Sequence, residues 1–248
     1  MKFRMIPFQK FSAATTMALD EAIMESIRAG ESLPTIRFYG WTPSAISIGY
    51  FQGLLNEVDL DACQAAGVDV VRRVTGGGAV YHDTDGEVTY SILGPVALFP
   101  ANILESYAVI CKDVTDSLGL LGIQSNFAPI NDILVDERKI SGNAQTRRGG
   151  IFLQHGTILY TVDVDRMFSL LTVSRTKIAD KLIQSVKKRV TCVREHSSAS
   201  IEELIDALQA GVSRQREIIP GDYTPKEIAR ARQLAQEKYG AQDWIAMR

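Results

Sequence analysis

Cysteine is scarce in this chain. Its 248 residues include 3 cysteines, Cys63, Cys111 and Cys192. An odd number at wide spacings excludes a disulfide framework and the CxxC pairs of many metal sites. Because disulfides are rare in reducing compartments, the pattern favours the cytoplasm.

Long apolar runs are also missing. No run approaches the roughly 20 apolar residues of a membrane helix. The first residues, MKFRMIPFQKF, lack the uninterrupted apolar segment of a signal peptide. A net charge of −2 argues against general attraction to nucleic acid or to anionic membranes. We therefore expect neither a nucleic-acid nor a membrane partner.

The remaining composition is that of an ordinary globular protein, with 46% hydrophobic and 23% charged residues. The chain shows no internal repeat and no low-complexity tract. The closest approach to a domain boundary is SRQREIIPGDYTP, over 213–225, and it is short. We predict one α+β domain over 1–248, with helices packed on a mixed β-sheet.

Apolar spacing and capping signals predict the helices. Apolar residues recur at four-residue steps over 14–29, and Gly30 is placed to end that helix. Further helices are predicted over 57–67 and 102–122. Capping boxes at 200–203 and 224–227 predict two more helices near the C-terminus.

Runs of β-branched and aromatic residues predict the strands. These strands lie at 35–41, 45–51, 68–74, 79–83, 87–93, 132–146 and 151–162. Thr84-Asp85-Gly86 predicts a hairpin between the fourth and fifth. The segment 132–146 is a second hairpin candidate, turning near Asp136-Glu137-Arg138.

The stretch RRVTGGGAVYHD, from Arg72 to Asp83, places three glycines beside two arginines. Consecutive glycines permit positive φ angles, and their N–H groups can form an anion-binding concavity. An arginine fork suits a carboxylate or a phosphate. The loop is neither a Rossmann GxGxxG nor a P-loop. Spacing alone leaves two interpretations open, an anion site or a glycine-rich turn with two solvated arginines.

The stretch NDILVDERKISGNAQTRRGG, from 131 to 150, is the second candidate. Lys139 opens a predicted strand after a tight turn, from which its ammonium can project into a cleft. Asn131 and Asp132 offer oxygen ligands for Mg²⁺. The alternative is an exposed hairpin with a surface lysine. His155, before Gly156, fits a core residue, a packing residue or a hydrogen-bond donor to substrate.

Together these stretches resemble the lipoate–protein ligase A family of the biotin/lipoate protein ligase superfamily. RRVTGGGAVYHD is similar to the family's RR-x-[ST]-GGGAV-[FY]-HD loop, and the second stretch continues through HGTIL as its lysine block does. RFYGWTPSAISIGYFQ and TKIADKLIQSVKKRV resemble the flanking segments. The resemblance implies the class II aminoacyl-tRNA synthetase-like catalytic fold, with a core over about 14–190 and a helical part over about 191–248.

The resemblance also implies a two-step reaction. Lipoate and ATP, with Mg²⁺, form lipoyl-adenylate, and a lysine of a lipoyl domain then attacks the mixed anhydride. Lys139 matches the lysine that contacts the lipoyl carbonyl and the phosphate. The other residues that match the adenylate site are Arg73, Thr75, Gly76, Gly77, Gly78, Ala79, Val80, Tyr81, His82 and His155. Asn131 and Asp132 match the pair near the nucleotide and metal.

The physical argument agrees with this resemblance, because a carboxylate and an α-phosphate must be brought within bonding distance. Lys139, Arg73 and the glycine-loop amides offer fixed positive charge and aligned donors. We therefore expect a protonated Lys139 that acts as an electrostatic clamp. Residues of AISIGYF and GTILY are candidates for an apolar slot that takes the acyl chain.

Alternatives remain within and outside the superfamily. Octanoyl- and lipoyl-transferases use a cysteine and no ATP, and in one group that cysteine lies shortly before the lysine-bearing strand. NFAPINDILVDERK contains none. Basic neighbours of Cys192 favour a lowered thiol pKa, although a buried, unreactive role is the simpler expectation. A biotin ligase fits less well, and a non-catalytic lipoate-binding module is the remaining class. The sequence does not separate lipoate from octanoate.

Many ligases of this family carry a small accessory domain after the catalytic domain. The C-terminal helices of this chain resemble the end of the catalytic domain, with no such domain after them. We therefore expect a separately encoded accessory subunit. The other expected partner is a lipoyl-domain acceptor protein.

Overall fold

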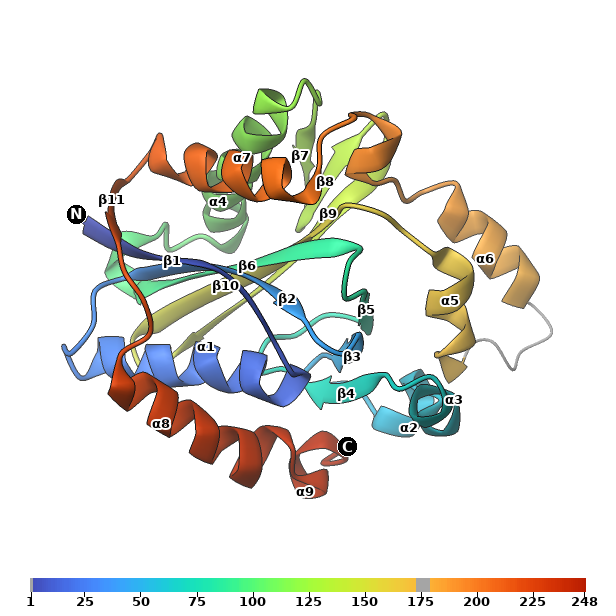
Figure 1. Cartoon of the computed structure of the whole chain (residues 1–248), viewed down its shortest axis with the longest axis horizontal. Helices are drawn as coiled ribbons and strands as arrows, with labels where there is room; N and C mark the ends of the chain where they lie inside the picture. The colour runs from blue at the N-terminus through green and yellow to red at the C-terminus, as the bar shows by residue number, and fades with distance from the viewer. Residues whose placement is uncertain (1, 173–178) are drawn as a thin grey trace.

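The computed structural model describes residues 2–172 and 179–248, and in these ranges the central feature is an eight-stranded mixed sheet (Figure 1). The strand order is β11-β1-β2-β6-β10-β9-β8-β7. Its strands are β1 (Lys2–Phe11), β2 (Thr35–Trp41), β6 (Glu87–Pro95), β7 (Asn126–Ala128), β8 (Asp132–Val135), β9 (Arg138–Arg148), β10 (Ile151–Leu159) and β11 (Glu217–Pro220). The predicted α+β class with a mixed sheet is confirmed.

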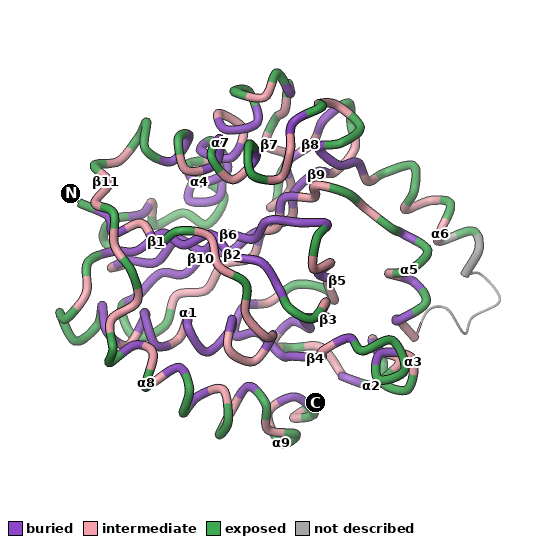
Figure 2. The backbone as a smooth tube through the Cα atoms, in the orientation of Figure 1, coloured by how far each residue is buried: buried purple, intermediate pink, exposed green. Residues whose placement is uncertain are grey.

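Helices cover both faces of this sheet. Helices α1 (Ala13–Arg28) and α8 (Pro225–Leu234) lie below it in the view of Figure 1, and α4 (Ile103–Leu120) and α7 (Ile201–Ser213) lie above it. All seven residues of β2 are buried, because successive side chains enter opposite cores. Phe38 packs with the α4 and α7 side, and Tyr39 with the α1 and α8 side. Burial is deepest along the central strands (Figure 2).

A second sheet of three strands carries the glycine-rich stretch. Its order is β4 (Asp69–Arg72), β3 (Ala45–Ile48), β5 (Val80–His82). The predicted hairpin across Thr84-Asp85-Gly86 is wrong, because β5 pairs with β3 while β6 lies in the large sheet between β2 and β10. The turn signal reflects only neighbouring residues. The glycine loop reverses the chain direction after β4, so that β5 runs antiparallel to β3 and pairs with it.

The remaining elements are short, and several lie near the small sheet. They are α2 (Leu54–Glu57), α3 (Leu60–Ala65), η1 (Val96–Leu98), α5 (Val164–Ser169), α6 (Ala179–Lys187), η3 (Val193–Glu195), η4 (Ala235–Tyr239) and α9 (Gln242–Ile245). Part of the basic stretch that resembles a family helix, 176–178, lies outside the described residues. No helix in the described part of the chain has the length and apolarity needed to cross a membrane.

Local signals placed several element ends correctly. Gly30 follows the end of α1 with φ 73°, as predicted, and Ser12, which had not been predicted, caps its start. Both predicted capping boxes form, at the starts of α7 and α8. The hairpin turns at Asp136 and Glu137, which have φ 48° and 59°. The stretch 213–225 is no boundary, because β11 within it pairs in parallel with β1; neither strand had been predicted.

Candidate active site

A cavity of about 320 Å³ lies where the small sheet faces one end of β9 and β10. The glycine loop and β5 contribute residues from Gly77 to Asp83, and β9 contributes Lys139 and residues 142–144. The buried side chains of Met17, Tyr39 and Trp41 also line the cavity. Two candidate stretches that are far apart in the sequence therefore meet at one cavity.

Arg73 braces the glycine loop from inside. Its guanidinium donates to the carbonyls of Ser47 (2.9 Å), Gly76 (2.9 Å) and Gly78 (2.7 Å), and to Ser47 Oγ (3.1 Å). Burial lowers the pKa of Arg73 to about 10, which leaves it protonated at pH 7. Arg73 lines the cavity as expected, but two of its hydrogen bonds hold the loop and two tie it to Ser47 in β3. Arg73 would therefore act on a ligand mainly through the electrostatic field of its charge at the cavity wall.

Arg72 does not line the cavity, and it is not a solvated arginine of a glycine-rich turn either. Its side chain is fully buried and donates to five carbonyls. These acceptors are Gly49, Tyr50, Gln52, Trp244 and Ile245, at 2.7–3.2 Å. Alternation along β4 sends neighbouring side chains to opposite faces. Arg72 consequently ties the C-terminal segment to the end of β3.

The glycines of the loop are needed for close backbone approach. Gly77 has φ 99°, a conformation that favours glycine. Gly49 directly follows β3. A Cβ atom there would lie 2.1 Å from the Gly77 carbonyl oxygen, so the loop packs directly on backbone. At Gly78 a Cβ would meet nothing within 4 Å. The loop therefore presents its main chain, free of side chains, to the cavity.

Lys139 lies at the cavity wall as predicted. Its ammonium is 2.7 Å from Asp132 Oδ1, and the lysine side chain is 40% exposed. Its chain lies over Gly142, where a Cβ would come within 2.7 Å of the lysine Cε. The lysine thus keeps access to solvent and has one carboxylate partner that β8 supplies across the hairpin.

The residues assigned to the metal are held by the same hairpin. Asn131 and Asn143 exchange side-chain to backbone hydrogen bonds, and Tyr90 donates to Asn143 Oδ1 at 2.6 Å. Asn131 lines the cavity, and Asp132 reaches it only through Lys139. No group of three His, Cys, Asp or Glu side chains in the described ranges could hold a metal. One carboxylate and one amide oxygen fit Mg²⁺ only if phosphates supply further ligands.

The two candidate histidines lie inside buried hydrogen-bond networks. His82 stacks on Trp41 at 3.9 Å between ring centroids and bonds Glu87 Oε1 (2.7 Å) and Ser47 Oγ (2.8 Å). His155 joins Thr75 Oγ1 (2.7 Å) to Asp20 (3.4 Å).

Burial lowers the pKa of His155, although Asp20 acts in the opposite direction. The lowered pKa favours a neutral ring at pH 7. Both histidines line the cavity, whereas Thr75 and Gly76 support the loop from outside its lining.

The apolar walls of the cavity were mostly missed by sequence reasoning. Of AISIGYF only Ser47 lines the cavity, whereas GTILY contributes Gly156, Thr157 and Leu159. The other apolar contacts come from Met17, Trp41, Val162, Val164, Met167, Val186 and Val190. Only long-range folding gathers these residues, so no spacing in the sequence marks them.

All three cysteines are free, buried and absent from the cavity lining. Burial raises the thiol pKa of Cys63 to about 11 and that of Cys111 to about 12. Burial also raises the pKa of Cys192. The simpler expectation of a buried Cys192 is confirmed, and the basic residues near it in sequence do not lower the thiol pKa, because burial and Glu195, 3.8 Å from the sulfur, raise it.

This arrangement defines the class of protein. Residues 12–213 match the family model of the lipoyl protein ligase A/B catalytic domain, and the chain belongs to that family. The family and fold expected from the glycine loop and the lysine block are thereby confirmed.

Individual relatives divide between two activities. The chain is 36% identical over 254 residues to the octanoyltransferase LipM of Symbiobacterium thermophilum, covering 92% of each protein. Among solved structures, it matches the archaeal bi-partite lipoate protein ligase system of Thermoplasma acidophilum with a TM-score of 0.90 and 32% identity, over 100% of this chain and 97% of that one. A lipoate-protein ligase A bound with ATP matches with a TM-score of 0.86 and 30% identity, over 99% of each chain.

Proposed function

We propose that this chain is the catalytic subunit of an ATP-dependent lipoate–protein ligase, which activates lipoate or octanoate as acyl-AMP and transfers the acyl group to a lysine of a lipoyl domain. One observation carries the choice of ligase. The cavity is lined by a lysine and by glycine-loop main chain, while all three cysteines lie outside its lining. Acyl transfer through a thioester needs a cysteine at the cavity.

In the first step, an acyl carboxylate oxygen attacks the α-phosphorus of ATP and pyrophosphate leaves. Both reacting groups are anions, so the rate depends on donors placed before the reaction begins. Lys139 supplies a full charge at the cavity wall, and the main chain of residues 77–80 supplies N–H groups. Arg73 holds the loop in its conformation, and its positive charge contributes to the electrostatic potential in the cavity.

When bound, Mg²⁺ would neutralise part of the phosphate charge. Asp132 and the amide oxygen of Asn131 are the groups that would hold it, together with the phosphates. In the second step, the neutral amine of the acceptor lysine attacks the acyl carbonyl and AMP leaves. Lys139 stabilises the oxyanion through the charge of its ammonium group.

The buried end of the cavity suits the acyl chain. Met17 and Trp41 present apolar surface there, and the polar groups beside them are largely paired with one another, although Glu87 Oε2 has no partner. His82 bonds Glu87, and Glu87 in turn accepts from Thr89 at 2.7 Å. Apolar chain burial of this kind contributes about 0.8 kcal/mol per CH₂ group.

The second candidate function is an ATP-independent octanoyltransferase. The full-length similarity to LipM favours it. This function requires a nucleophilic cysteine at the cavity, and the described lining contains no cysteine. The bi-partite neighbour favours two further parts of the main proposal, a lipoyl-domain acceptor and a separate accessory subunit that completes the site.

The deciding experiment incubates the purified chain with lipoate or octanoate, ATP and a lipoyl domain, and follows pyrophosphate and acylated lysine. A parallel reaction supplies an octanoylated carrier protein without ATP. Pyrophosphate release and ATP-dependent acylation support the ligase. Transfer from the carrier without ATP, with no pyrophosphate, selects the transferase, and tight lipoate binding without either product selects a binding module.

The accessory subunit is tested by separating the two half-reactions. The chain alone is expected to transfer from preformed lipoyl-adenylate and to activate free lipoate poorly. Complete conversion of lipoate and ATP to acylated acceptor at about 1 s⁻¹ or faster by the chain alone would remove the need for a partner.

A further inference from the structure

Lys139 lies where its strand loses one of its neighbours. The pairing between β9 and β10 ends at Ser141, which is opposite Ile158. At Lys139 the place of β10 is taken by residues 189–191. The Lys139 N–H donates to the Arg189 carbonyl at 2.7 Å, and the Thr191 N–H donates to the Lys139 carbonyl at 2.9 Å. The backbone of Lys139 is therefore fixed on this side by a segment from outside the hairpin.

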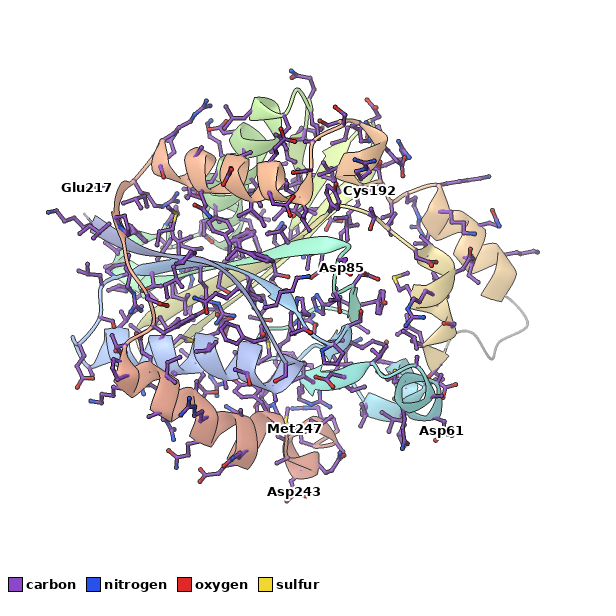
Figure 3. The ribbon with its side chains drawn as sticks, in the orientation of Figure 1. Asp61, Asp85, Cys192, Glu217, Asp243 and Met247 are labelled. Carbon is purple, nitrogen blue, oxygen red and sulfur yellow. The ribbon has the colours of Figure 1, made fainter. Side chains whose placement is uncertain are left out.

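We call residues 189–196 the lysine strap. The side chain of Thr191 is fully buried and lies 2.7 Å from His196 Nε2. His196 Nδ1 faces Asp136 Oδ2 at 3.9 Å, on the turn that precedes Lys139. Arg138, next to the lysine, bonds Glu195 at 2.6 Å. Figure 3 labels Cys192, which directly precedes the turn η3 in this strap.

The strap also connects Lys139 with the cavity. Val190 forms an isolated parallel bridge with Lys139, and both Val186 and Val190 line the cavity. A shift of the strap therefore moves the lysine and one cavity wall together. The hydrogen bond between Thr191 and His196 closes this segment on itself at a buried point, where an unpaired hydroxyl would be costly.

We propose that His196, acting through Thr191, is a positioning residue that sets the place of Lys139 in the cavity. This inference rests on the proposed role of Lys139 in adenylate formation. His196 is not among the described residues that line the cavity, and its side-chain polar partners are Thr191 in the strap and Asp136 in the hairpin turn. Its effect on the reaction is exerted through the backbone hydrogen bonds of residues 189–191.

The test compares His196→Ala, His196→Gln and Thr191→Val with Arg194→Ala, a control on the same turn whose side chain lies over Tyr160. Thr191→Val removes the hydroxyl with nearly the same volume, and it provides the test if His196→Ala fails to fold. Measurements are kcat and KM for pyrophosphate release, thermal unfolding, and trace acetylation of Lys139. Lys112, paired with Asp116 on α4, is the internal reference for acetylation.

We expect kcat to fall about tenfold in His196→Ala and Thr191→Val, with KM for the acyl substrate little changed, because small displacements of a catalytic group reduce the rate steeply. Lys139 acetylation relative to Lys112 should rise at least twofold as the lysine leaves Asp132. His196→Gln should recover part of kcat, since its amide can donate to Thr191, and Arg194→Ala should match the wild type.

Wild-type kcat and Lys139 acetylation in folded His196→Ala and Thr191→Val would overturn the inference, provided that Lys139→Ala is inactive in the same assay. An active Lys139→Ala would instead overturn the proposed role of the lysine.

Discussion

The glycine loop and the lysine hairpin both contain basic side chains near glycines, but these side chains differ in burial and in hydrogen-bond partners. In the loop, Arg72 and Arg73 are buried, and they donate mainly to main-chain carbonyls. In the hairpin, Lys139 is partly exposed and faces a single carboxylate. A guanidinium has five donors in a fixed fork and can organise several carbonyls at once, whereas an ammonium acts as a compact charge on a flexible stem.

This difference separates scaffolding from chemistry. Arg73 holds the glycine loop and Arg72 holds the end of β3 by donating to main-chain carbonyls, whereas Lys139 presents its charge at the cavity wall. Substitutions in the hairpin should therefore change rates more than stability. Substitutions of the arginines and packed glycines should change stability first.

The largest effect on rate is expected for Lys139→Ala. Loss of one preorganised donor typically costs about 10²–10³ in rate, and the charge adds to this. Thermal unfolding should change little, since the side chain is partly exposed. Pyrophosphate release measures the effect, and Lys112→Ala is a control lysine with an exposed ion pair. Pyrophosphate release at the wild-type rate would show that the charge of Lys139 is not used.

The next effect is on stability, in Arg72→Ala. Its removal leaves buried carbonyls at the end of β3 and in the C-terminal segment without donors, and we expect a loss of about 3 kcal/mol in the free energy of unfolding. Urea unfolding measures this loss, with exposed Arg232→Ala as the control. A loss below about 1 kcal/mol would mean that water readily replaces the guanidinium.

A smaller loss is expected for Gly49→Ala. The new Cβ would lie 2.1 Å from the Gly77 carbonyl oxygen, so either β3 or the loop must shift. Such overpacking typically costs about 1–3 kcal/mol. ATP affinity should fall in parallel, measured by calorimetry. The matched control is Gly119→Ala in α4, where a Cβ meets nothing within 4 Å and helix propensity favours alanine. Equal affinities in the two variants would show that the loop tolerates displacement.

The smallest effect is expected for the cysteines. Single Cys63→Ala, Cys111→Ala and Cys192→Ala variants should keep ATP-dependent acylation near the wild-type rate when folded. Because burial raises the thiol pKa, to about 11 for Cys63 and about 12 for Cys111, thiolate is scarce at pH 8 and increases only as the pH rises toward those values. Iodoacetamide at pH 8 should therefore leave activity intact. Inactivation, together with a thioester-linked acyl group on the wild-type chain, would favour the transferase.

The structure of the lysine hairpin could be predicted from the sequence more completely than that of the glycine loop. The turn at Asp136 and Glu137 and the position of Lys139 after it follow from local chemistry, and both agree with the structure. For the loop, the run of glycines predicted close backbone approach correctly. It did not predict which way each arginine points, because that depends on how β4 pairs and which face of the small sheet is buried.

By itself, the sequence determined the family, the main helices, their caps and the two stretches that carry the proposed chemistry. These features depend on residues close together in the chain, such as Ser200 with Glu203 or the glycines after Arg73. The tertiary structure alone decided that β5 leaves its neighbour β6 for another sheet, that Met17 and Trp41 meet at one cavity, and that the cysteines stay outside its lining. The physical reason is that burial and strand pairing join residues distant in sequence, and no local pattern of residue types encodes which partners they find.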